Sequence, residues 1–324
     1  MGATIKVAAA IVAAVLGTNL TNNVQVNGKV SSRKMIIEDT SYQSSCAEEF
    51  IPTELEIGEK DQIISWAEDL VKKNHAGIPP VDVERLAIRV GIKEIRKANI
   101  SVDGILLPTQ EGFVLTINEN SHPTRQRFTC AHEIAHTYFE PLHCELRVAN
   151  TQDTAMIKTC NGNLEHLCDI AATHILMPDQ MFKQAALKFG VSIEAINHLA
   201  DMFQTSIRAT AIRFVETSRE PTVLIFSQVY DKPDSSPKLR VRWSAQRRRS
   251  SSSNSYYIPP FVSIGDDSKI YQAYKTEGIY KGFENFDIGN LKGAYYTESK
   301  SFGSDNNKYL ISLIFVEAQT KRLF

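Results

Sequence analysis

Two histidines four residues apart, with a glutamate between them, are the residues best suited to chemistry. The stretch RQRFTCAHEIAHTYFE (125–140) contains His132, Glu133 and His136 in the pattern HExxH. Four residues of an α-helix turn about 400°, so the two imidazoles lie within about 40° of each other and can bind one tetrahedral zinc ion. Glu133 lies beside that face, where it can take a proton from a zinc-bound water. The motif therefore predicts two zinc ligands and a catalytic base.

A third zinc ligand is expected on a second helix, predicted over 165–177 and stopped by Pro178. Glu165 and Asp169 lie one helical turn apart there. This spacing suits one carboxylate ligand and a second carboxylate that accepts the N–H of a ligating imidazole. A solvent-exposed carboxylate pair is the alternative interpretation. Five other side chains of ligand type compete for the third position: His143, Cys144, Cys160, His166 and Cys168.

The elements that must position these residues can be predicted from apolar spacing. The HExxH helix fits between Pro123 and Pro141, and amphipathic helices are expected over 61–73 and 81–90, the second ending at Gly91. The β-branched and aromatic run 112–118 predicts a strand that leads directly into the HExxH helix. If that strand lies at a sheet edge, its free backbone groups could hold an extended substrate peptide.

Three further helices are predicted over 181–189, 193–203 and 207–215, and the last two have the outline of a helix-turn-helix. Arg208 and Arg213 are the only basic residues in the last helix. So few positive charges favour packing over the reading of DNA, and we expect no direct nucleic-acid binding.

Beyond Pro221 the apolar pattern changes to a period of two. Strands are predicted over 222–230, 238–246, 256–264, 293–302 and 309–318. The run Arg247–Arg249 followed by serines is interpreted as an exposed loop, with an anion or nucleic-acid contact as the alternative. The expected fold class is α+β. The expected domains are a poorly ordered N-terminal extension (1–58), a catalytic domain with a helical bundle (59–218) and a β-rich domain (219–324).

Composition favours a cytoplasmic globular protein. Of the 324 residues 43% are hydrophobic and 23% charged, and the net charge is -1, which indicates neither a nucleic-acid nor an anionic membrane partner. Five unevenly spaced cysteines fit reduced, mostly buried thiols better than disulfides, with a redox or ligand role as the alternative. The apolar run 7–16 is too short to span a bilayer and is interpreted as part of the N-terminal extension, with a signal-peptide core as the alternative.

Several motifs together resemble the ImmA/IrrE family of metallo-endopeptidases over roughly residues 60–218. The resemblance rests on RQRFTCAHEIAH, on VLTINEN before it, and on E165-x-x-x-D169 with I175-L-M-P178 after it. PVDVERLAIRVGI and SIEAINHLADMFQTSIRATAIRF are also similar to that family. The chain departs from the usual pattern at Cys130 and Cys168, where aliphatic residues or alanine are expected, and at Ala171, where an aromatic residue is usual.

The resemblance implies a zincin-like fold of the gluzincin type with a small sheet. It implies that His132, His136 and Glu165 bind Zn²⁺, that Glu133 is the base, and that Asp169 supports a ligand. It also implies a protein substrate, typically a helix-turn-helix repressor or regulator, whose cleavage switches on stress or mobile-element genes. Tyr138 and His166 are candidate donors to the oxyanion or tuning residues.

Two functional hypotheses follow. The first is a zinc endopeptidase. The second is a non-enzymatic regulator that binds DNA or a repressor, with a structural zinc closed by a fourth protein ligand such as Cys160 or Cys168.

Overall fold

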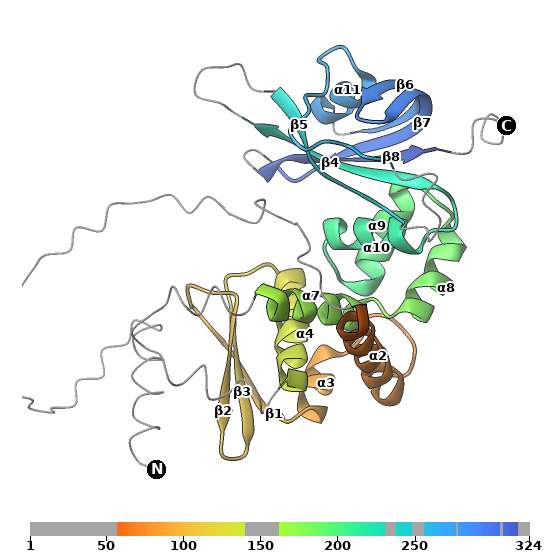
Figure 1. Ribbon diagram of the computed structural model, residues 1–324. Helices are drawn as coiled ribbons and strands as arrows, with labels where there is room; N and C mark the ends of the chain where they lie inside the picture. The colour runs from red at the N-terminus through yellow and green to blue at the C-terminus, as the bar shows by residue number, and fades with distance from the viewer. Residues whose placement is uncertain are drawn as a thin grey trace, which may run out of the picture.

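The computed structural model describes residues 57–139, 162–230, 238–247, 256–276, 278–304 and 307–316. Nearly all of the predicted N-terminal extension, with its apolar run, lies outside these ranges. So do three of the competing ligands and two arginines of the basic run: His143, Cys144, Cys160, Arg248 and Arg249. Within the described residues, helices and two sheets are mixed, so the predicted α+β class is confirmed (Figure 1).

A three-stranded sheet lies next to the HExxH helix. Its strands are β1 (Ile92–Ala98), β2 (Gly104–Thr109) and β3 (Gly112–Asn118), in the order β1-β3-β2. β2 and β3 form an antiparallel hairpin, and β1 runs parallel to β3. The predicted strand 112–118 is confirmed as β3, but it is the central strand. The idea that it offers a free edge is therefore wrong, because β1 and β2 occupy both of its sides.

Four helices build the region of the HExxH motif. They are α2 (Ile57–Asn74), α3 (Val83–Arg89), α4 (Pro123–Phe139) and α7 (Gly162–Leu176). Figure 1 shows α4 and α7 side by side between the small sheet and α2. Ala131 and Ala135 of α4 and Ala171 of α7 are fully buried in the main core, where small side chains allow helices to pack closely. The four predicted helices are thus present.

The next three helices are also found where they are predicted. α8 (Asp179–Phe189), α9 (Ile193–Phe203) and α10 (Ile207–Thr217) follow one another with short turns. Ser192 and Ser206 cap α9 and α10, since each hydroxyl accepts a hydrogen bond from the backbone N–H three residues on. Gln204 ends α9 in the left-handed conformation.

The C-terminal part is a five-stranded antiparallel sheet in the order β5-β4-β8-β7-β6. The strands are β4 (Thr222–Tyr230), β5 (Lys238–Gln246), β6 (Ile279–Ile288), β7 (Leu291–Phe302) and β8 (Tyr309–Phe315). One face packs on α9 and α10, and the other is covered by the short helix α11 (Lys269–Lys275). Sequence reasoning missed β1, β2, β6 and α11.

The predicted strand over 256–264 is wrong. This segment runs along the edge of β5 and is joined to it by a few backbone hydrogen bonds, such as Phe261 N to Val241 O at 2.7 Å. Pro259 and Pro260 have no N–H to donate, and Phe261 has a φ of 64°, so the segment cannot continue a ladder.

A single hydrophobic core connects the HExxH helix with the C-terminal sheet. It contains Ile134 of α4, Ile175 of α7, Leu199 of α9 and Leu313 of β8. A second, smaller core fills the space between the sheet and α11. The helical bundle is therefore packed between the small sheet and the large one.

Candidate metal centre

The packing of α4 against α7 brings four predicted site residues together. Nε2 of His136 lies 3.1 Å from Nε2 of His132, and Oε2 of Glu165 lies 3.0 Å from the same His132 atom. The second carboxylate oxygen of Glu165 is 3.6 Å from Nε2 of His136. On the other side of the ring, Nδ1 of His132 lies 2.9 Å from Oδ1 of Asp169. Two imidazoles and one carboxylate thus point at one position, and a second carboxylate holds one imidazole.

The donor spacing fits a tetrahedral ion. Two donors bound to one zinc ion at about 2.0–2.1 Å are about 3.3 Å apart when the angle between them is tetrahedral. The three separations around His132, His136 and Glu165 range from 3.0 to 3.6 Å. Two nitrogens and a carboxylate are also the donor types that zinc accepts. The residues present therefore fit the ion.

The site is negative on its open side. Only 6% of the His136 side chain and 15% of the His132 side chain are exposed, against 48% of the Glu165 side chain. Burial alone would lower the pKa of His132, but hydrogen bonds to Asp169 and Glu165 outweigh it and raise that pKa to about 9. The same imidazoles hold the pKa of Glu165 well below its usual range. Without a metal, a proton on His132 balances the carboxylates, and a cation would replace it.

Glu133 is the predicted base, and its side chain is short of hydrogen-bond partners. The residue is 8% exposed, and its Oε2 atom has no partner among the described residues. An unpaired buried carboxylate oxygen is costly, so such an atom is usually satisfied by water or by a ligand. Its other oxygen lies on the side of Gly104, at the start of β2: a Cβ built on that glycine would be 3.5 Å from Oε1.

The start of β2 is the functional feature that sequence reasoning missed. An ion pair of 2.6 Å between Arg125 and Asp103 ties α4 to this point. A Cβ on Gly104 would lie only 2.4 Å from Cγ2 of Thr129, so β2 touches α4 where a side chain does not fit. The Asp103-Gly104 pair is a turn signal in the sequence, but nothing in the sequence indicates this contact.

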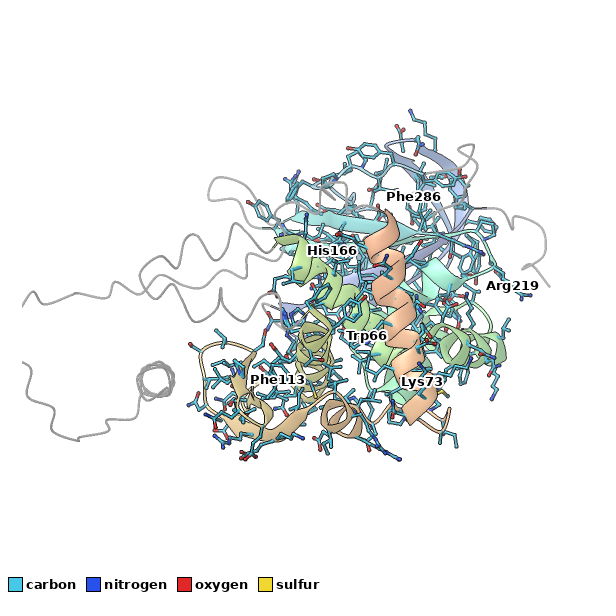
Figure 2. The ribbon with its side chains drawn as sticks, turned by 60° about the horizontal axis from the view of Figure 1, so that its bottom comes forward. Trp66, Lys73, Phe113, His166, Arg219 and Phe286 are labelled. Atoms are coloured by element: carbon cyan, nitrogen blue, oxygen red, sulfur yellow. The ribbon has the colours of Figure 1, made fainter. Side chains whose placement is uncertain are left out.

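The two candidate oxyanion donors, Tyr138 and His166, lie on α4 and α7, close to α2. The ring of Tyr138 packs against Trp66 of α2, with centroids 5.0 Å apart, and against Phe139. His166 lies on α7 beside α2 (Figure 2), and burial lowers its pKa.

The far end of α7 is held by a buried ionic network. Arg213 of α10 donates to the Met177 carbonyl and to Asp179, at 3.2 Å each. Glu68 of α2 lies 2.8 Å from Nδ1 of His174 and accepts a hydrogen bond from the backbone N–H of Asp179. The helix that carries Glu165 and Asp169 is thus tied to α2 and α10.

This geometry outlines a candidate metal-binding domain built on an HExxH helix, and known proteins with a similar domain can be compared with it. Residues 83–215 match the family model described as the IrrE N-terminal-like domain, Peptidase_M78. This match and the two curated relatives support the ImmA/IrrE family that the motifs predict.

Two curated relatives are similar over the same part of the chain. The radiation response metalloprotease IrrE of Deinococcus radiodurans is 30% identical over 152 residues, covering 47% of this chain and 41% of the relative. The protein of the same name from Deinococcus deserti is 28% identical over 113 residues, covering 35% of this chain and 40% of the relative. The chain thus spans about two fifths of the length of these relatives.

Among solved structures, a transcriptional regulator of Mycobacterium tuberculosis aligns with 79% of this chain and 76% of its own, at 15% identity and a TM-score of 0.49. None of the described helices is long and apolar enough to cross a membrane.

Proposed function

We propose that this protein is a zinc-dependent endopeptidase of the gluzincin type. The observation that carries the proposal is the convergence of His132, His136 and Glu165 at spacings of 3.0–3.6 Å, next to the buried, unpaired carboxylate oxygen of Glu133. Family membership supports it, since both curated relatives are metalloproteases by name.

The two imidazoles and Glu165 would hold the zinc, which supplies polarisation of the scissile carbonyl and a bound water of lowered pKa. Glu133 accepts the proton of the attacking water and later delivers it to the leaving amine. Asp169 accepts the Nδ1–H of His132, which leaves Nε2 free to face the metal. Each residue therefore has a separate role in one hydrolysis reaction.

The edge strand β2 is the proposed docking site for the substrate backbone. Among the described strands β2 pairs only with β3, so its other side presents backbone groups for strand addition. Gly104 brings this strand against α4 close to Glu133. A peptide paired with β2 would therefore pass in front of the catalytic carboxylate. This replaces the expectation that β3 holds the substrate.

The proposed substrate is a regulator or repressor protein with a helix-turn-helix, cleaved in the cytoplasm to switch on stress or mobile-element genes. Its support is the family relationship and the radiation-response names of the relatives. The proposal also takes Zn²⁺ as the metal, which the donor set supports.

The test uses the full chain and a small helix-turn-helix repressor encoded next to it. Purified wild type should bind one zinc per chain and cleave the repressor, and a chelator should stop cleavage. Glu133→Gln should keep the zinc and lose cleavage, whereas Glu165→Gln should lose zinc as well. The zinc content reports metal binding, and mass spectrometry of the products reports cleavage. An active Glu133→Gln variant would refute the assignment of the base.

The rival function, a DNA-binding or repressor-docking regulator, has less support. Arg208 stacks on Phe226 and Trp243 of the C-terminal sheet, 4.8 and 5.7 Å from the ring centroids. Arg213 is 5% exposed within the ionic network. Arg213 is therefore engaged inside the protein, and Arg208, although exposed, is engaged with two aromatic rings. A salt-dependent shift of DNA mobility, without cleavage of the repressor, would favour the rival instead.

A further inference from the structure

A thiol lies beside the two imidazoles of the metal centre. Sγ of Cys168, a nitrogen of His132 and a nitrogen of His136 all lie within 4.8 Å of one another. Cys168 is on α7, three residues after Glu165, and is fully buried. The same helix thus presents two donors of different chemistry to one pair of imidazoles.

The position of Cys168 differs from that of the other described cysteine. Cys130 is also buried and also belongs to the main core, but its thiol faces the carbonyl of Val83 at 3.9 Å, toward α3. Both thiols are outside disulfides. Burial as a small hydrophobic side chain would account for either residue. Only Cys168 combines that burial with a place next to two zinc-binding nitrogens.

We propose that Cys168 is an additional, exchangeable ligand, so that the ion has two nitrogen donors, one oxygen donor and one sulfur donor when no substrate is present. The inference rests on the proposed metal site. Sulfur binds zinc at about 2.3 Å and nitrogen at about 2.0–2.1 Å, so tetrahedral sulfur and nitrogen donors are about 3.6 Å apart. The sulfur and the two nitrogens already lie within 4.8 Å of one another, so a small rotation of the cysteine side chain would bring the sulfur to that separation.

The exchange balances as a simple ligand substitution. The S–H proton leaves to solvent when the sulfur binds the ion, and it returns when water takes the sulfur's place. With sulfur bound, four protein ligands fill the coordination shell and no position remains for the attacking water. The resting site is then closed, and docking of a peptide must displace the sulfur.

A sulfur donor also changes which ions the site prefers. Thiolate favours softer ions such as Cd²⁺, whereas a site of imidazole and carboxylate favours harder ones. The ratio of Cd²⁺ to Zn²⁺ affinity therefore reports whether sulfur is a ligand, and its measurement needs no substrate.

The experiment loads the full chain with Co²⁺ and records its near-ultraviolet absorption, where a sulfur-to-cobalt charge-transfer band appears only if sulfur is bound. Wild type should show the band. Cys168→Ala and Cys168→Ser should bind one Co²⁺ per chain without it, and their Cd²⁺ to Zn²⁺ affinity ratio should fall. Cys130→Ala is the matched control and should keep the band and the ratio. Circular dichroism should show that each variant is folded.

The outcomes separate this inference from the proposed function. If wild type binds Co²⁺ through His132 but shows no band, the inference is overturned and the endopeptidase remains. If His132→Ala binds as much Co²⁺ as wild type, the metal site itself is wrong. With sulfur bound at rest, Cys168→Ala should cleave the repressor faster than wild type. A Cys168→Ala variant that retains metal but loses cleavage would overturn the exchange, because removal of a ligand that blocks the water position should not abolish hydrolysis.

Discussion

His132 and Asp169 form a pair 2.9 Å apart across the contact of α4 with α7, with Nδ1 of the imidazole facing a carboxylate oxygen. The contact fixes the rotation of the imidazole about its χ angles and directs Nε2 toward Glu165 and His136. Asp169 therefore orients His132 as a metal ligand without itself binding the metal.

Replacing Asp169 by asparagine should weaken zinc binding without removing it. The amide can still contact Nδ1 but does not increase the basicity of the imidazole, so affinity should fall about 10–100-fold. Competition with a fluorescent chelator measures this. Asp69→Asn, at an exposed residue paired with Lys73, is the control and should change nothing. Unchanged affinity in Asp169→Asn would show that the contact does not tune the ligand.

The metal-free protein should have a stability maximum in mildly acidic solution. His132, with its pKa raised from 6.5 to about 9, contributes stability that is present below pH 6.5 and is lost as the pH rises through 9. Glu165, with its pKa lowered from 4.5, contributes stability that is present above pH 4.5 and is lost on acidification. The melting temperature of chelated wild type should exceed that of Glu165→Gln most between pH 4.5 and 6.5. A difference that does not vary with pH would contradict the pairing.

Gly104→Ala should destabilise the contact between β2 and α4. The new Cβ would lie 2.4 Å from Cγ2 of Thr129, so the strand must shift, at a cost of about 1–3 kcal/mol. Thr129→Ser removes that methyl group, and the double variant should regain most of the loss in denaturant unfolding. Gly58→Ala, with nothing within 4 Å of the added Cβ, should not destabilise the protein. Additive effects of the two substitutions would mean that the methyl group is not the obstacle.

Arg213→Met should lower the free energy of unfolding by about 2–4 kcal/mol, because Glu68 and Asp179 then lose a buried cation while the apolar volume is kept. Arg208→Met is the matched change on the same helix. It removes only cation–π contacts with Phe226 and Trp243, so about 1 kcal/mol is expected. Equal losses in urea denaturation would show that the network contributes nothing beyond packing.

Helix geometry is local, and for this reason much of the fold and of the site can be predicted from the residues alone. The spacing of His132 and His136 places them on one face of any helix, and the prolines around 123–141 limit that helix. Serine caps at Ser192 and Ser206 and apolar periodicity likewise fixed the three helices from α8 to α10. The pairing of Glu165 with Asp169 was predictable because it also lies within one helical turn.

Features that depend on contacts between distant segments become visible only in the folded protein. β1 carries four charged residues and β2 contains Pro108, features that hide their strand character, and their pairing makes β3 the central strand. The approach of Gly104 to Thr129, and the place of Cys168 beside the imidazoles, depend on how α4 packs against β2 and α7. Such contacts arise from the shape of the whole core, because side-chain packing across elements has no period in the sequence.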